Sequence, residues 1–92
     1  MTIRERIIAK LTQALDPIAL EVIDESHRHA GHAGAREGGE THYRVRVASA
    51  AFAGKSRLER HRMVNAALAA EFADGVHALA LQTDAPGEVA RP

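Results

Sequence analysis

Histidines are the residues of this chain whose type and spacing could support chemistry. Three of the six, His27, His29 and His32, lie in one glycine-bearing segment, and His77 stands much later, at the start of a predicted strand. The chain has no cysteine, so it can offer imidazole nitrogen to a borderline metal ion but no thiolate. Any iron–sulfur centre bound here must therefore take its sulfur ligands from a partner.

Simpler interpretations of these histidines stay open. Histidines in a glycine-rich loop are solvated about as often as they are metal ligands, but the spacing of His27, His29 and His32 also suits an isolated zinc or nickel site. A single histidine at a strand start, such as His77, more often packs or forms a hydrogen bond than binds a metal. An independent metal-binding loop is therefore one hypothesis for this chain.

Length and charge limit the class of protein. The 92 residues suffice for one domain and are too few for two hydrophobic cores. The 12 basic and 12 acidic side chains cancel, which removes the strong positive field of a dedicated nucleic-acid binder. We find no apolar run that could span a membrane and no secretory signal, so we expect a cytoplasmic protein. The lack of cysteine excludes a disulfide framework.

Residue patterns predict five elements and a short tail. Thr2 with Glu5, and Ser56 with Glu59, match the capping box that begins a helix. Alternating apolar residues indicate strands. The predicted order is helix 2–15, strand 19–24, loop 26–39, strand 41–47, a helix from residue 56 that stops at Asp74–Gly75, and strand 76–83. Residues 1–83 are thus expected to form a single domain, followed by a short flexible tail at 84–92.

The strand at 41–47 alternates apolar and polar residues, so one face should pack on the core and the other should be wet or bind something polar. His42 is expected on this polar face, and His61 on a helix surface. The apolar positions are Tyr43, Val45 and Val47, and the polar positions are His42, Arg44 and Arg46.

The order of the elements predicts an α+β fold. A strand, a helix and a strand that follow one another in a sheet cross over with a right-handed connection and pair in parallel, whereas strands joined directly pair antiparallel. We therefore expect a three-stranded mixed sheet covered by helices on one face.

Five short motifs stand in order along nearly the whole chain, from about Ile7 to Thr83. They are Asp24–Ala30 (DESHRHA), Glu40–Tyr43 (ETHY), Phe52–Gly54 (FAG), Arg60–Val64 (RHRMV) and Val76–Leu81 (VHALAL). Together they resemble the BolA family. The resemblance implies a class II KH-like fold, in agreement with the order above, and a monothiol glutaredoxin partner with which BolA-like proteins share a [2Fe–2S] cluster.

The resemblance also implies ligands for that cluster. His77 matches the invariant ligand of the family, and His29 best matches the loop ligand, which is histidine or cysteine in different branches. His32 is a near alternative for the loop position, and His27 is a weaker one. Two imidazoles of this chain, one glutaredoxin thiolate and one glutathione thiolate would complete the ligand set. The isolated protein is therefore expected to carry no cofactor. We also expect the isolated protein to be a monomer or a weak dimer.

A run of basic side chains begins the second predicted helix, at Lys55, Arg57, Arg60 and Arg62. Such runs are usually a solvated face. KH folds bind single strands through a G-x-x-G loop, but Gly54–Arg57 lacks the second glycine, which argues against RNA binding of that kind. The run could instead contact duplex DNA as a helix-turn-helix does, or meet the carboxylates of glutathione or an acidic glutaredoxin surface.

No enzyme constellation is visible in the sequence. The chain has no cysteine nucleophile, no G-x-S-x-G motif and no phosphate-cradling loop. We therefore interpret it as an adaptor that binds a monothiol glutaredoxin, co-ligates a [2Fe–2S] cluster, and acts in iron–sulfur cluster trafficking or iron regulation. The alternative is a DNA-binding transcriptional regulator that uses the basic second helix.

Overall fold

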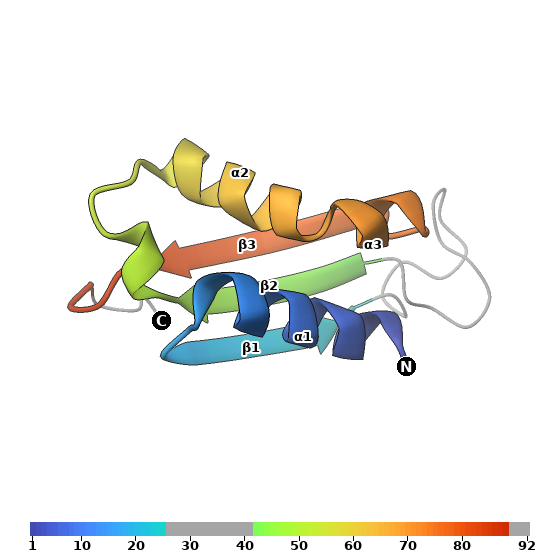
Figure 1. Ribbon diagram of the computed structural model, residues 1–92. Coiled ribbons are helices and arrows are strands. Elements are labelled where there is room, and N and C mark those ends of the chain that lie inside the picture. Colours follow the sequence, from blue (N-terminus) through green and yellow to red (C-terminus); the bar gives the residue numbers. More distant parts are fainter. Residues whose placement is uncertain (26–41, 89–92) are drawn as a thin grey trace.

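The chain folds as a small sheet with helices on one side. The computed structural model describes residues 1–25 and 42–88. In chain order the elements are α1 (Ile3–Leu15), β1 (Ala19–Asp24), β2 (His42–Ala48), the 3-10 helix η2 (Ala50–Phe52), α2 (Arg57–Ala67), α3 (Ala69–Ala73) and β3 (Ala78–Asp84). Figure 1 shows α1, α2 and α3 on the same side of the sheet. None of the helices described is long and apolar enough to cross a membrane.

The sheet is mixed, with the strand order β1-β2-β3. β1 pairs antiparallel with β2, so that Val22 lies opposite Val45. β2 pairs in parallel with β3, so that His42 lies opposite Ala78 and Val45 opposite Leu81. The α+β class and the mixed sheet expected from the order of elements are confirmed.

The first helix begins and ends where its sequence predicts. Thr2 Oγ1 accepts a hydrogen bond from the Glu5 amide at 3.1 Å, and the Thr2 amide donates to Glu5 Oε1 at 2.8 Å. These bonds satisfy backbone groups that the first turn leaves open. The bond from the Thr2 amide to the carboxylate is the main cause that lowers the pKa of Glu5. The chain leaves α1 at Asp16, in the left-handed region at φ 44°, directly before Pro17, which cannot continue the helix.

The core lies between the sheet and the helices. Apolar residues spaced by about four along α1 and by two along β2 point to it, as the periods of helix and strand require. The most deeply buried apolar residues of the described chain include Ile7 and Leu11 from α1, Val45 and Val47 from β2, Phe52 from η2, and Val64 and Leu68 from the second helical segment.

The second predicted helix is two helices in the structure. α2 and α3 meet at Leu68, which has φ −106° and ψ 17°. The Leu68 amide donates to the carbonyls of both Val64 and Asn65, at 3.0 and 3.2 Å, which tightens the last turn toward 3-10 geometry. Leu68 and Glu71, on either side of the break, are both buried. No local stop signal stands at Leu68, which is why the sequence predicted one continuous helix.

The packed chain extends past the predicted start of the tail. Asp84 is the last residue of β3, and its carbonyl accepts a hydrogen bond from the Ser49 amide at 2.9 Å. Ala85 is buried, and its amide donates to Glu88 Oε1 at 2.9 Å. Asp84 thus belongs to β3, and Ala85 and Glu88 have hydrogen-bond partners in the fold, so the predicted tail begins too early. Residues 89–92 lie outside the described residues.

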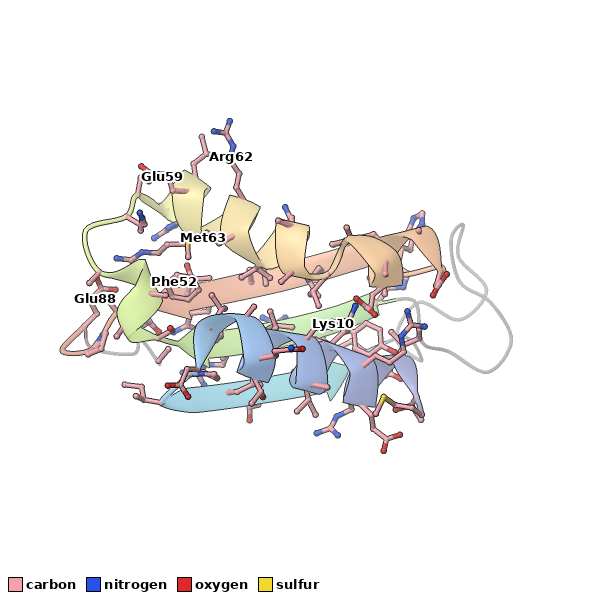
Figure 2. All side chains as sticks on the ribbon, in the orientation of Figure 1. Lys10, Phe52, Glu59, Arg62, Met63 and Glu88 are labelled. Carbon is pink, nitrogen blue, oxygen red and sulfur yellow. The ribbon has the colours of Figure 1, made fainter. Side chains whose placement is uncertain are left out.

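A buried carboxylate joins α3 to α1. The Glu71 side chain is 1% exposed and lies 2.9 Å from Arg6 Nη2 and 3.3 Å from Lys10 Nζ. Figure 2 shows Lys10 reaching from α1 toward α3. Arg6 also contacts Asp74 at 2.7 Å, and its hydrogen bonds to Asp74 and Glu71 raise the pKa of Arg6. A buried carboxylate is stable only with partners of this kind.

We expect Glu71→Gln to lower the free energy of unfolding by about 2 kcal/mol, because hydrogen bonds to a charged group contribute roughly 1.5–3 kcal/mol. Urea denaturation followed by far-ultraviolet circular dichroism measures the change. Glu21→Gln is the matched control, since Glu21 is exposed and lies 3.9 Å from Arg46, and such surface pairs contribute less than about 1 kcal/mol. Equal losses in the two variants would contradict this role of Glu71.

Candidate functional site

His77 lies at one end of the sheet, in the connection between α3 and β3. Gly75 turns the chain out of α3 at φ 122°, a conformation that glycine adopts easily. The next residue, Val76, is buried, whereas His77 is exposed. β3 begins at Ala78, two residues later than predicted, so His77 precedes the strand.

The two residues that flank segment 26–41, Glu25 and His42, meet at the end of the sheet where His77 lies. The amide of Glu25, directly before the segment, donates to the carbonyl of His42, directly after it, at 2.8 Å. Because β2 and β3 are parallel and His42 lies opposite Ala78, His77 is also at this end. Figure 1 shows the end of β1 and the starts of β2 and β3 together.

The three loop histidines lie outside the described residues. This applies to His27, His29 and His32, so their role as ligands stays a prediction. In the part of the chain that the structure describes, no group of three or more histidine, cysteine, aspartate or glutamate side chains could hold a metal ion. A metal bound at His77 would therefore need further ligands from segment 26–41 or from a partner.

His77 contacts a second histidine, which the sequence alone did not pair with it. The rings of His42 and His77 have centroids 5.3 Å apart and planes inclined by 52°, within the usual range for aromatic pairs. His42 lies on the same strand face as Arg44 and Arg46, as expected. Arg44 and Arg46 are exposed, but His42 is only 8% exposed, so the expectation that its position is wet is wrong. The register of β2 and β3 brings the two rings together, and no local pattern contains that register.

The basic run at the start of α2 divides into two groups. Lys55, Arg57 and Arg62 are exposed, and Figure 2 shows Arg62 pointing away from the sheet. The side chain of Arg60 is only 12% exposed. Three of these four predicted binding residues are thus accessible to a partner, and Arg60 is engaged within the protein.

Arg60 ties the start of α2 to the end of the described chain. Its Nη1 and Nη2 donate to the two carboxylate oxygens of Glu88 at 2.7 and 2.8 Å. Nη1 also donates to the Thr83 carbonyl at 3.1 Å, and Nε to the Lys55 carbonyl at 3.0 Å. The guanidinium carbon lies 5.9 Å from the centre of the Phe52 ring, and Figure 2 shows Phe52 and Glu88 at this same end. To bind a phosphate, Arg60 would have to release Glu88.

The bond to Arg60 changes the acidity of Glu88. Hydrogen bonds from Arg60, and then from the Ala85 amide, lower the pKa of Glu88 to about 2. A carboxyl whose pKa is lower in the folded than in the unfolded chain stabilises the fold above its unfolded pKa of about 4.3. This stabilisation is lost as the pH falls from there toward 2.

We expect the wild-type protein to lose more stability between pH 5 and pH 2 than Glu88→Gln does, because the variant has no carboxylate to protonate at this position. Urea denaturation at a series of pH values measures the difference. Glu21→Gln is the control and should follow the wild type. A pH dependence in Glu88→Gln equal to that of the wild type would contradict the role of the Arg60–Glu88 pair.

The histidine end and the basic run lie at opposite ends of β3. His77 stands just before the strand, whereas Arg60 contacts the carbonyl of Thr83 near its end. The extended chain from His77 to Thr83 covers roughly 20 Å at about 3.3 Å per residue. The two groups of candidate residues therefore form two separate sites.

Comparisons with known proteins agree on one family. Residues 11–88 match the family described as BolA-like protein. A Sinorhizobium sp. protein named "Uncharacterized protein in cobS 5'region" is 51% identical over 92 residues, 99% of each chain. The DNA-binding transcriptional regulator BolA of Escherichia coli (strain K12) is 49% identical over 83 residues, 90% of this chain and 75% of that protein. The structure of the BolA domain of SufE1 from Arabidopsis thaliana has a TM-score of 0.84 and 45% identity, and the match covers 94% of each chain.

Proposed function

Because this chain belongs to the family of BolA-like proteins, we propose that it is a non-catalytic adaptor that binds a monothiol glutaredoxin and co-ligates a [2Fe–2S] cluster with it. The cluster is cargo, which the complex passes on in cluster trafficking or senses in iron regulation. His77 is the ligand on the folded domain. His29 is the ligand from segment 26–41, with His32 and His27 as alternatives.

The position of Glu25 and His42, which flank segment 26–41, at the same end of the sheet as His77 carries this proposal. β1 and β3 flank β2 at about 4.8 Å per strand, so Glu25 and His77 lie roughly 10 Å apart. At no more than about 3.6 Å per residue, His29 can lie up to about 14 Å from Glu25 and His27 only about 7 Å. Chain length therefore allows His29 to meet His77 at one iron, and it gives His27 the shorter reach.

The donors of this chain fit part of a cluster site. The chain supplies neutral imidazoles and no cysteine, so the thiolates come from glutaredoxin and glutathione. Replacing thiolate by neutral imidazole removes negative charge from the cluster and raises its reduction potential. A shared cluster should therefore be distinguishable from one held by four thiolates.

The position of His77 suits a ligand for a partner's cluster. It is exposed and lies at the edge of the fold, just after the buried Val76. A partner can reach it without opening the core, while the backbone around it is held by Val76 and β3. This combination of an anchored backbone and an accessible imidazole supports the choice of His77 as the ligand on the folded domain.

Visible circular dichroism during anaerobic titration into a cluster-loaded monothiol glutaredoxin tests the proposal. We expect a new spectrum that saturates at one chain per glutaredoxin. His77→Ala should abolish it, because the ligand on the folded domain is lost. His29→Ala should weaken it, with partial substitution by His32.

His61→Ala is the control for this titration, since His61 is a half-buried histidine of α2 that the proposal does not use. It should give the wild-type spectrum. A normal complex formed by the double variant His29→Ala, His77→Ala would contradict the ligand assignment. Stoichiometric zinc binding by the isolated protein, without a change in the titration, would favour the independent metal-binding loop.

DNA binding is a second candidate function. The exposure of Lys55, Arg57 and Arg62 favours it, and the Escherichia coli relative is named a DNA-binding transcriptional regulator. The engagement of Arg60 by Glu88 reduces the charge available on this surface. The net charge of zero also gives no long-range attraction to a polyanion.

If this surface binds duplex DNA, the double variant Arg57→Gln, Arg62→Gln should bind more weakly. The slope of log K against log salt should become shallower by about 2, because each phosphate contact contributes about 0.9. Fluorescence anisotropy with a labelled duplex measures both effects. Arg46→Gln, which removes an exposed cation on the sheet, is the control. Equal effects in the control and the double variant would contradict a specific surface on α2.

A further inference from the structure

His42 is a firmly held residue at the end of the sheet. It is the first residue of β2 and lies opposite Ala78 in the parallel pairing. Its carbonyl accepts the hydrogen bond from Glu25 that closes the β1–β2 pair. With 8% of its surface exposed, its ring has little room to move.

His77 differs from His42 in this respect. It is exposed and precedes β3, and within the described residues no hydrogen bond or ion pair holds its imidazole. An exposed side chain without such bonds moves between staggered rotamers on the picosecond to nanosecond timescale. The His42 ring lies 5.3 Å from the His77 ring, centroid to centroid. This contact can therefore restrict the rotamers of a side chain that is otherwise free to change them.

The residues around the two rings allow this contact. Since the residue opposite His42 is Ala78, no side chain longer than a methyl group stands there on β3. The ring of His77, one residue earlier, packs on His42 with its plane inclined by 52°. This tilted arrangement is among those that aromatic pairs prefer, and such pairs are favourable beyond the area that they bury.

We infer that His42 is a positioning residue that orients the imidazole of His77 through ring packing. The inference rests on the proposed function, in which His77 is a ligand to a cluster shared with a partner. Ligand histidines are usually oriented by neighbouring groups, and loss of such a neighbour typically weakens metal binding by 10–100-fold. His42 would thus restrict the rotamers of His77 before the partner binds. Less side-chain conformational entropy of His77 is then lost on binding.

Nuclear magnetic resonance of the free, isotope-labelled protein tests the orientation without any partner. Three-bond couplings to Cγ of His77 report its rotamer populations. We expect one dominant rotamer in the wild type, couplings nearer the rotamer average in His42→Ala and His42→Gln, and wild-type couplings in His42→Phe, which keeps a ring. His61→Ala is the control and should leave them unchanged.

A merely structural role of His42 would lower stability without these changes, so the couplings separate the two roles. Unchanged His77 couplings in a folded His42→Ala or His42→Gln protein would overturn the inference. Averaged couplings in His42→Phe would also overturn it, because a ring at this position would then not be sufficient. The glutamine variant is included because it fills more of the site than alanine if the alanine variant does not fold.

The cluster titration then tests whether the orientation is used. We expect His42→Gln to bind the cluster-loaded glutaredoxin about tenfold more weakly than the wild type, and His42→Phe to be close to wild type. Wild-type affinity in His42→Gln would overturn the inference and leave the proposed function intact. Absence of any cluster spectrum with the wild-type chain would overturn the proposed function, and the His77 couplings would still decide whether His42 orients His77.

Discussion

The parallel pairing of β2 with β3 is the constraint on which both candidate sites depend. At one end of the pair, the register of His42 with Ala78 brings His77 to the end of the sheet where Glu25 and His42 flank segment 26–41. At the other end, the same register brings the backbone of Thr83 to Arg60. A shift by one residue would turn the apolar side chains of β3 away from the core, so burial of the inner face maintains the register.

Two carboxylates connect the helices to the rest of the fold in different ways. Glu71 is buried and forms ion pairs with Arg6 and Lys10 of α1. These two cations compensate the charge of the carboxylate where water has no access. Glu88 is more exposed and binds Arg60 with both oxygens. The Arg60–Glu88 pair shows that the four basic side chains at the start of α2 do not share one role. Arg60 stabilises the position of the chain after β3.

The described part of the chain brings two histidines together but does not complete a metal site. His77 is accessible, His42 packs against it, and no third donor side chain among the described residues joins them. A metal ion at His77 therefore needs further ligands from segment 26–41 or from a partner, since a closed structural site commonly needs four ligands.

The sequence by itself determined those features that depend on residues close together in the chain. The capping box of Thr2 with Glu5 begins α1, Asp16 with Pro17 ends it, and alternation along β2 defines its buried face. The mixed sheet followed from the order of elements, because crossover connections have one preferred hand. The five motifs, read together, were sufficient for the family, to which the chain belongs.

Only the tertiary structure decided which distant residues meet. The contact of the His42 and His77 rings and the bond of Arg60 to Glu88 each join groups from different parts of the chain. The break between α2 and α3 at Leu68 is likewise not marked by any local sequence signal. His42 and His77 are 35 positions apart, and their contact requires a particular strand register that neither local sequence contains. Local patterns encode interactions over about one helical turn or two strand positions, whereas register and burial come from the whole core packing at once.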